Sequence, residues 1–363
     1  MGHDEYRHPS AGMRGTDPSG YGVGVMRRLS ILLAVLLAAE ARAQQATYQL
    51  TDDGEWVEIA TPEPGTDEAV MGQARRYIAG GKPKKAKKLL DTWIKDNEFT
   101  ESPWLPEAYL LRGDAKTAAG NEYKALYDYE TVINEFPASS AFTLAVEREL
   151  DIGVKYVNGM RRKFLGIRFS NASKAGEELL VRVQERMVGS VLAERAMIEL
   201  ADFYYRQRDM DMAAEAYDIF IRLYPQSEYI KKAMQRRIYA NIAKFKGPRY
   251  DASGLVEAKF LIREFANLYP ADAERAGLTN ALASRLDESA GAQMFEVARW
   301  YLKRDDPVSA RFELRRLVRR YPLTNAADKG YRIMLERGWV EPLDDDDGPV
   351  EDVTQDGAAE ASP

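Results

Sequence analysis

Cysteine is absent from the 363 residues, and histidine occurs only at His3 and His8. Without cysteine the chain can form no disulfide framework, thiolate metal site or thiol nucleophile. Both histidines lie in a stretch that we expect the mature protein to lack, so the usual groups for proton transfer near neutral pH are missing. We therefore predict a protein that is not an enzyme, with no catalytic residue, cofactor or metal. Paired carboxylates stay open as a route to chemistry, although the adjacent acids Asp287 and Glu288 are more simply the start of a helix.

Long apolar runs are also scarce. The longest, residues 29–39, has eleven residues and is apolar except for one serine, about half of the ~20 that a spanning helix needs. Two arginines precede it and Ala-Arg-Ala follows, the layout of a secretory signal. We predict a signal peptide at residues 26–43, cleavage that leaves Gln44 first, and export to the periplasm or cell envelope of a bacterium. Residues 1–25 are expected to be a disordered leader, and a true translation start at Met26 is open.

Basic charge does not dominate any large part of the chain. The net charge is −6, and residues 341–363 carry nine acidic side chains and no basic one. With one net positive charge in residues 1–43, the body at residues 44–340 has a net charge of only +2. Nucleic-acid binding requires a strongly basic face, so we predict no nucleic-acid partner. The acidic tail cannot build a core and is expected to be disordered.

What the sequence does contain is a repeat. Small residues are followed by large ones and a closing proline at fixed steps of three, four, five and nine residues. The copies are Gly113, Lys116, Ala125, Tyr129, Val132, Pro137; Ala201, Tyr204, Ala213, Tyr217, Phe220, Pro225; Ala298, Tyr301, Ala310, Leu314, Leu317, Pro322; and, without proline, Ala74, Tyr77, Ala86, Leu90, Trp93. Steps of three and four keep residues on one helical face. Small residues let two antiparallel helices approach, and proline ends the second helix.

The distances between copies leave room for two degenerate units. Their second helices fall near residues 176–183 and 258–270. We therefore predict an all-α solenoid at residues 67–340, with six helical hairpins and a closing helix from about Thr324, a plausible cap, to Arg337. Outside it, alternating residues at 48–50 and 56–59 flank Asp-Asp-Gly and predict a small β-hairpin within an N-terminal extension at residues 44–66.

These residues resemble the tetratricopeptide repeat (TPR) family, whose helical hairpins carry this pattern. The endings Tyr224-Pro225-Gln226-Ser227 and Phe136-Pro137-Ala138-Ser139 are similar to those of BamD-like periplasmic proteins of the outer-membrane assembly machinery. The resemblance implies a non-catalytic scaffold that binds envelope proteins or extended peptides, with a role in outer-membrane protein assembly. BamD carries a lipidated cysteine where Gln44 stands here, so no lipid anchor is expected. The alternative is a peptidoglycan-associated envelope enzyme or its accessory subunit.

In TPR proteins, ligands lie in a groove lined by the first helix of each hairpin. On the first helix of the fourth hairpin, Asp202, Tyr205 and Arg206 lie away from the Ala201/Tyr204 packing face. The same offsets from Ala298 in the last hairpin give Arg299 and Lys303, and Phe295 lies one turn earlier. The predicted partner-binding residues are Asp202, Tyr205, Arg206, Phe295, Arg299 and Lys303. Charges beside aromatic rings suit an extended peptide.

Five arginines fall on one predicted helix, at Arg311, Arg315, Arg316, Arg319 and Arg320. A solvated helix face with local pairing to Glu313 explains such a cluster most simply. The other readings are anionic lipid, which leaves peripheral membrane association open, an acidic partner, nucleic acid, or the protein's own acidic tail.

Overall fold

The computed structural model describes residues 47–50, 56–59, 62–164 and 167–340. The predicted leader, signal peptide and acidic tail lie outside these residues. The chain divides into two units, Met1–Ala69 and Val70–Pro363, each described by itself below. Within the described part of the chain, no helix combines the length and apolarity needed to span a bilayer.

The first unit contains a β-hairpin. Strand β1 (Thr47–Leu50) pairs antiparallel with β2 (Trp56–Ile59), with Thr47 opposite Ile59 and Leu50 opposite Trp56. The two strands coincide with the alternating residues at 48–50 and 56–59 for which the sequence predicts a hairpin.

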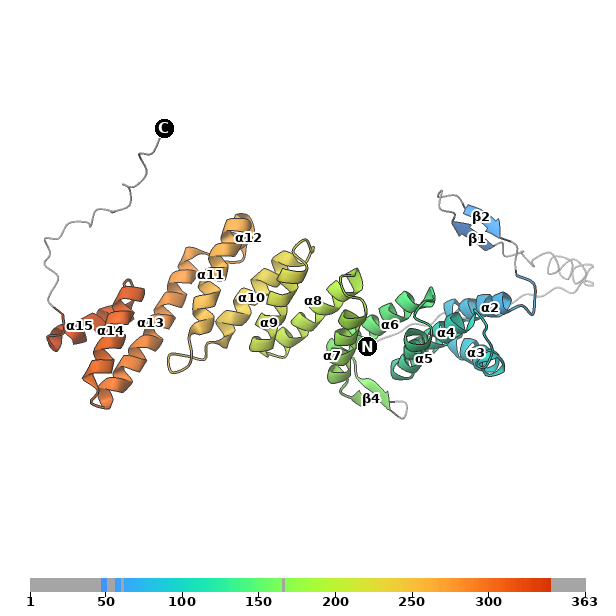
Figure 1. The fold of residues 1–363 in the computed structure, drawn as a ribbon, viewed down its shortest axis with the longest axis horizontal. Helices are drawn as coiled ribbons and strands as arrows, with labels where there is room; N and C mark the ends of the chain where they lie inside the picture. The colour runs from blue at the N-terminus through green and yellow to red at the C-terminus, as the bar shows by residue number, and fades with distance from the viewer. Residues whose placement is uncertain (1–46, 51–55, 60–61, 165–166, 341–363) are drawn as a thin grey trace, which may run out of the picture. The chain divides into compact units, whose positions relative to one another are not determined.

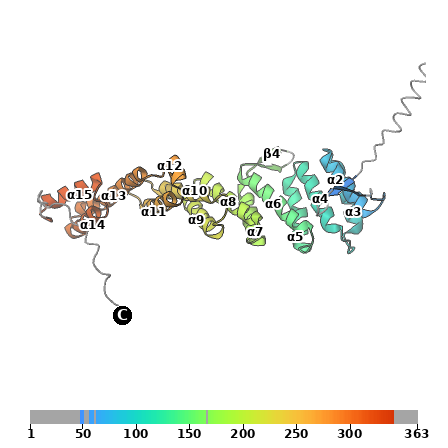
Figure 2. The ribbon, with the colours of Figure 1, turned by 90° about the horizontal axis from the view of Figure 1, so that it is seen from above.

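The second unit is built from helical hairpins in chain order (Figure 1). The pairs are α2 (Asp67–Ala79) with α3 (Pro83–Asn97), α4 (Leu105–Ala118) with α5 (Glu122–Glu135), α6 (Ala141–Val157) with α7 (Ser173–Arg186), α8 (Val191–Arg206) with α9 (Met210–Leu223), α10 (Ile230–Lys244) with α11 (Ser253–Leu268), and α13 (Asn280–Lys303) with α14 (Pro307–Arg320). The closing helix is α15 (Asn325–Glu336). Each helix packs mainly on its neighbours in sequence (Figure 2). The six hairpins and the closing helix confirm the predicted all-α TPR-like solenoid.

The small residues of the repeat sit where helices cross. Ala201, Ala213, Ala298 and Ala310 are each fully buried. At Gly113 the approach is closest, because an added Cβ would lie 2.4 Å from a ring carbon of Tyr129. The Tyr129 ring of the second helix thus occupies the space that Gly113 of the first helix leaves, as the pattern predicts.

Helix α15 begins as the sequence indicates. The Thr324 hydroxyl accepts a hydrogen bond from the Ala327 amide at 3.1 Å, which satisfies one of the free N–H groups of the first turn. Asp209 and Asp306 cap α9 and α14 in the same way. These capped turns fix where each helix starts and therefore the register of its packing face.

Two elements were not predicted. A short hairpin of β3 (Arg162–Phe164) and β4 (Ile167–Ser170) separates α6 from α7. Helix α12 (Pro270–Arg275) follows α11 directly, because proline is well tolerated in a first helical turn.

The prediction that Asp287 and Glu288 start a helix is wrong. Helix α13 begins at Asn280, so both acids lie in its interior. Asp287 forms an ion pair with Lys259 of α11 at 2.5 Å. Glu288 accepts a hydrogen bond from the backbone amide of Asn325 at 2.9 Å. The two carboxylates therefore hold α11 and α15 against α13.

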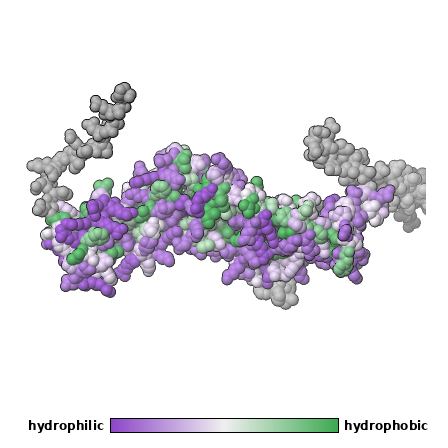
Figure 3. Space-filling model, in the orientation of Figure 1, coloured by the Kyte–Doolittle hydropathy of each residue, from purple (hydrophilic) through white to green (hydrophobic). Residues whose placement is uncertain are grey.

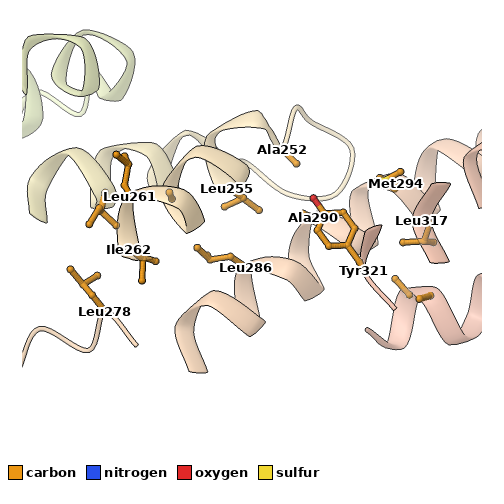
Figure 4. Close-up of a cluster of buried hydrophobic side chains, with 14 of the residues drawn as sticks. Ala252, Leu255, Leu261, Ile262, Leu278, Leu286, Ala290, Met294, Leu317 and Tyr321 are labelled. Carbon is orange, nitrogen blue, oxygen red and sulfur yellow. The ribbon is translucent and has the colours of Figure 1, made fainter. Parts of the chain in front are cut away.

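The largest apolar cluster lies in the C-terminal hairpins. Figure 4 shows Leu255, Leu286, Ala290, Met294 and Tyr321 among its members. They come from α11, α13 and the end of α14, so this cluster joins the fifth hairpin to the sixth. It supports the long helix α13, which carries half of the predicted binding residues.

Candidate protein-binding surfaces

The structure corrects the placement of Asp202 on an open groove. Asp202 is only 5% exposed, because it lies on α8 where this helix faces α9 and α10. The Tyr217 hydroxyl donates a hydrogen bond to Oδ1 at 2.6 Å, Lys232 Nζ lies 2.6 Å from Oδ2, and Arg236 also contacts Oδ1. Burial alone would raise the pKa of Asp202, but the hydrogen bonds from Lys232 and Tyr217 outweigh it and hold this pKa below its ordinary value. Asp202 is thus an ionised packing residue.

Tyr205 and Arg206 occupy different environments. The Tyr205 ring is half-buried, packs edge-on against Tyr217 at 6.3 Å between centroids, and has the Arg236 guanidinium 5.6 Å from its centre. Arg206 is exposed, with one guanidinium nitrogen 3.5 Å from the Val157 carbonyl oxygen. Replacing Tyr205 would therefore disturb the helix interface, and only Arg206 of the three α8 residues is free to meet a partner.

The residues predicted on α13 lie in a separate place, five helices further along the chain than α8. Phe295 is half-buried against the C-terminal apolar cluster. Arg299 and Lys303 are exposed, and Arg299 pairs with Glu296 at 2.6 Å. Among the described residues, no cavity is lined by residues of both this set and the α8 set.

Arg299 and Lys303 both line a cavity of about 510 Å³. It lies between the C-terminal half of α13 and the loop that joins α10 to α11. Its full lining is Pro248, Arg249, Gln293, Glu296, Val297, Arg299, Trp300, Tyr301 and Lys303. We call it the α13 pocket.

Trp300 gives the α13 pocket its apolar character. The indole is 49% exposed, packs at right angles on Tyr301 with centroids 5.0 Å apart, and is covered on one face by Arg304 at 4.2 Å. These neighbours hold the ring in place without burying it. Sequence reasoning missed Trp300, although a tryptophan directly after the predicted Arg299 and off the Ala298/Tyr301 packing face was the available signal.

A larger cavity of about 850 Å³ lies on the other side of the α10–α11 loop. Much of its wall is charged or polar, with Asp209, Asp211, Lys244, Asp251 and Glu257 among the lining residues. Lys244 already pairs with Asp211 at 3.4 Å, and Asp209 caps α9. A wall of this kind, with its charges partly paired, suits water better than an apolar anchor.

The contacts of Asp202 recur two hairpins earlier, at Asp114. Asp114 accepts a hydrogen bond from the Tyr129 hydroxyl at 2.8 Å and from Arg148 Nε at 3.0 Å. In both cases the aspartate is on the first helix of a hairpin, the tyrosine on its second helix, and the arginine on the next hairpin. The spacing is identical, with 15 residues from aspartate to tyrosine and 19 from tyrosine to arginine. We call this arrangement the Asp–Tyr–Arg relay.

Beside the first relay lies a pair of carboxylates. Glu149 of α6 is fully buried, and Arg186 of α7 contacts both Glu149 and Glu130. Burial first and the charge of Glu130 second raise the pKa of Glu149 to about 8, because the opposing effect of Arg186 is smaller than either. The equivalent positions beside the second relay hold Asp218 and Arg237, an ordinary ion pair at 3.0 Å.

Replacing Glu149 by glutamine is expected to remove a pH dependence of stability. Because the folded pKa is raised from the ordinary value near 4.5, the folded chain binds more protons than the unfolded chain between these pH values. The wild type therefore loses stability as pH rises from about 5 to 8.5. The glutamine variant should match it at pH 5 and exceed it by about 1–2 kcal/mol at pH 8.5. Melting both proteins at each pH across this range measures the difference. A constant difference in stability between them at every pH would contradict the prediction.

Among the residues that the structure describes, no cluster of three or more histidine, cysteine, aspartate or glutamate side chains could hold a metal ion. The face that Figure 3 shows is mainly polar and charged, with apolar patches between. The site residues can contribute hydrogen bonds, ion pairs and aromatic contacts.

Two family profiles match the sequence. The profile of a family described as an outer membrane lipoprotein matches residues 167–339, and that of a tetratricopeptide repeat matches residues 107–139. The matches confirm the resemblance to TPR proteins and to the BamD-like outer-membrane group. No curated protein matches the sequence.

Several solved structures are similar in fold. The C-terminal part of a TPR repeat-containing protein from Cytophaga hutchinsonii is 13% identical, with 84% of this chain and 96% of that chain covered and a TM-score of 0.37. PilW, a widely conserved type IV pilus biogenesis factor, is 11% identical, with 74% and 99% covered and a TM-score of 0.29. A thermophilic TPR protein from Thermus thermophilus is 14% identical, with 60% and 99% covered and a TM-score of 0.27. At such scores these structures add nothing to what the helices themselves show.

Proposed function

We propose that this chain is a non-catalytic protein-binding scaffold of the bacterial cell envelope, exported by the signal at residues 26–43 and serving outer-membrane protein assembly. The match of residues 167–339 to an outer-membrane lipoprotein family and the TPR-like array support it. A repeat array presents an extended surface on rigid helices, which is the form that protein recognition commonly takes in such folds.

The observation that carries the proposal furthest is the α13 pocket. It combines an exposed indole with Arg249 and Lys303, neither of which has a carboxylate within 4.0 Å among the described residues. A rigid aromatic ring that is exposed before binding gains much from burial, and tryptophan and arginine dominate binding energy at interfaces. The two cations select for negative charge nearby. The fitting partner is an extended peptide segment with an apolar side chain next to an acidic one.

The test is the double variant Trp300→Ala with Lys303→Ala. We expect about tenfold weaker capture of the envelope partner, because loss of a central anchor costs over 1 kcal/mol. Tagged chains are crosslinked in envelope extract, and the captured proteins are quantified by mass spectrometry.

The matched control is Phe99→Ala with Lys95→Ala, an exposed aromatic and an exposed lysine far along the chain from the pocket. It should capture the wild-type set of partners in full. Both variants are first compared with the wild type by circular dichroism. If the pocket variant folds normally and still captures every partner, this pocket is not the binding site.

A further inference from the structure

Helix α14 carries five arginines that the rest of the array does not neutralise. Arg315, Arg316, Arg319 and Arg320 are exposed, and Arg311 is half-buried. Among the described residues, the one carboxylate within 4.0 Å of any of them is Glu313, which lies 3.7 Å from Arg316. Elsewhere in the array arginines such as Arg186 and Arg237 each contact two carboxylates.

Such spacing is unfavourable within the helix. Arg311 with Arg315, Arg315 with Arg319, and Arg316 with Arg320 stand four residues apart, where like charges repel. The C-terminal dipole of α14 favours the two arginines of its last turn but does little for those further back. An anionic partner would relieve this repulsion.

The end of the described chain lies against this helix. The carbonyl oxygen of Trp339 accepts hydrogen bonds from Arg311 Nη2 at 3.2 Å and Arg315 Nη2 at 3.4 Å. Trp339 is therefore held on the basic face of α14, one residue before the end of the described chain. Residues 307–340 hold eight basic and three acidic side chains, whereas residues 341–363 hold nine acidic side chains and no basic one.

We propose that the acidic segment 341–363 docks on α14, with the carboxylates of Asp344–Asp347 paired to Arg315, Arg316 and Arg319. These acids follow Val340 by four to seven residues and can reach roughly 13–25 Å from it. One helical turn, from Arg315 to Arg319, spans only about 6 Å. Because the segment is tethered, its effective concentration at α14 is of millimolar order, so individually weak ion pairs suffice.

The surface beside these arginines matches the rest of the segment. Phe312 on α14 is 60% exposed. Arg320 and Tyr321 border two small cavities, of about 230 and 350 Å³, between α11 and α14. Ala290 lines both of them and lies close to Tyr321 (Figure 4). Leu343 and Val350 give the acidic segment the apolar side chains that such a mixed surface accepts.

The absence of cysteine makes a clean distance measurement possible. Spin labels are attached to Val308→Cys, at an exposed position in the first turn of α14, and to Thr354→Cys in the acidic segment. In the full chain at 0.1 M salt we expect a short, narrow distance distribution. At 1 M salt, where the screening length falls from about 10 Å to about 3 Å, it should lengthen and broaden.

Two charge variants give the decisive comparison. Arg315→Gln with Arg319→Gln should broaden the distribution already at 0.1 M salt. The matched control, Lys84→Gln with Lys85→Gln on α3, removes the same charge from exposed lysines and should leave it narrow. In the variant Arg315→Glu with Arg319→Glu, replacing each of Asp344, Asp345, Asp346 and Asp347 by lysine should restore the narrow distance distribution.

A distribution that is broad and independent of salt in the wild type overturns the proposal, as does one that the two arginine substitutions leave unchanged. Anionic membrane is the competing occupant of this helix face. If the docked segment screens α14, ending the chain after Val340 should increase sedimentation with vesicles of phosphatidylserine and phosphatidylcholine. Equal sedimentation of the full and shortened chains would assign the arginines to another partner.

Discussion

Replacing Asp202 by alanine is expected to lower the free energy of unfolding by about 2–4 kcal/mol, because it leaves two cations and a tyrosine hydroxyl without their shared acceptor. Asp202 is buried, whereas the Lys232 and Arg236 side chains are 40% and 35% exposed. Water can therefore reach the orphaned cations, and the loss stays near the lower end of what a buried pair would cost. Urea unfolding, together with amide hydrogen exchange in α8 to α10, measures the size and location of the loss.

Two related variants calibrate this result. Asp211→Ala removes a carboxylate whose side chain is 87% exposed and should change stability little. Asp114→Ala breaks the other relay and should cost less than Asp202→Ala, because Asp114 is more exposed and contacts one cation instead of two. A loss at Asp202 no larger than at Asp211 would mean that the relay does not stabilise the array.

Enlarging Ala213 or Ala310 to leucine is expected to destabilise the protein by about 1–3 kcal/mol in each case. Both alanines are fully buried where the two helices of a hairpin cross. The extra atoms can fit only if the helices separate or neighbouring side chains leave their preferred rotamers. Thermal melts of the single variants measure the loss.

The matched control is Ala281→Leu, an exposed position near the start of α13. Leucine and alanine are both good helix formers, so this variant should melt within a degree or so of the wild type. Unchanged melts at both Ala213 and Ala310 would show that the small residues are not the points of closest approach.

The helical part of the fold could be predicted because it depends on local periodicity. Small and large residues at fixed steps place the crossings, and prolines and caps place the ends, without knowledge of distant contacts. The strands β3 and β4 were missed because no Asp-Gly or Asn-Gly pair separates them, whereas Asp-Asp-Gly separates β1 from β2. Asp287 and Glu288 were misplaced because an acidic pair is equally compatible with a helix start and with contacts to other helices.

The binding residues were harder to predict because exposure depends on other helices. Asp202 lies off the repeat's own packing face, but Lys232 and Arg236 of α10 cover it. Lys116, which breaks the repeat pattern, pairs with Asp128 across its hairpin at 2.6 Å. The equal spacing of aspartate, tyrosine and arginine in the two relays was present in the sequence and could have shown that Asp202 is enclosed.

The relay also imposes a direction along the chain. Asp114 and Asp202 each find their arginine 34 residues later, on the hairpin that is synthesised next. A chain that emerges N-terminus first thus holds an incompletely paired aspartate until the following hairpin has formed. Within the described part of the chain, the α13/α14 hairpin is followed by the single helix α15, and the same repeat position there is Arg299, which is exposed. The end of the array therefore dispenses with the buried acid, and the position becomes available to the α13 pocket.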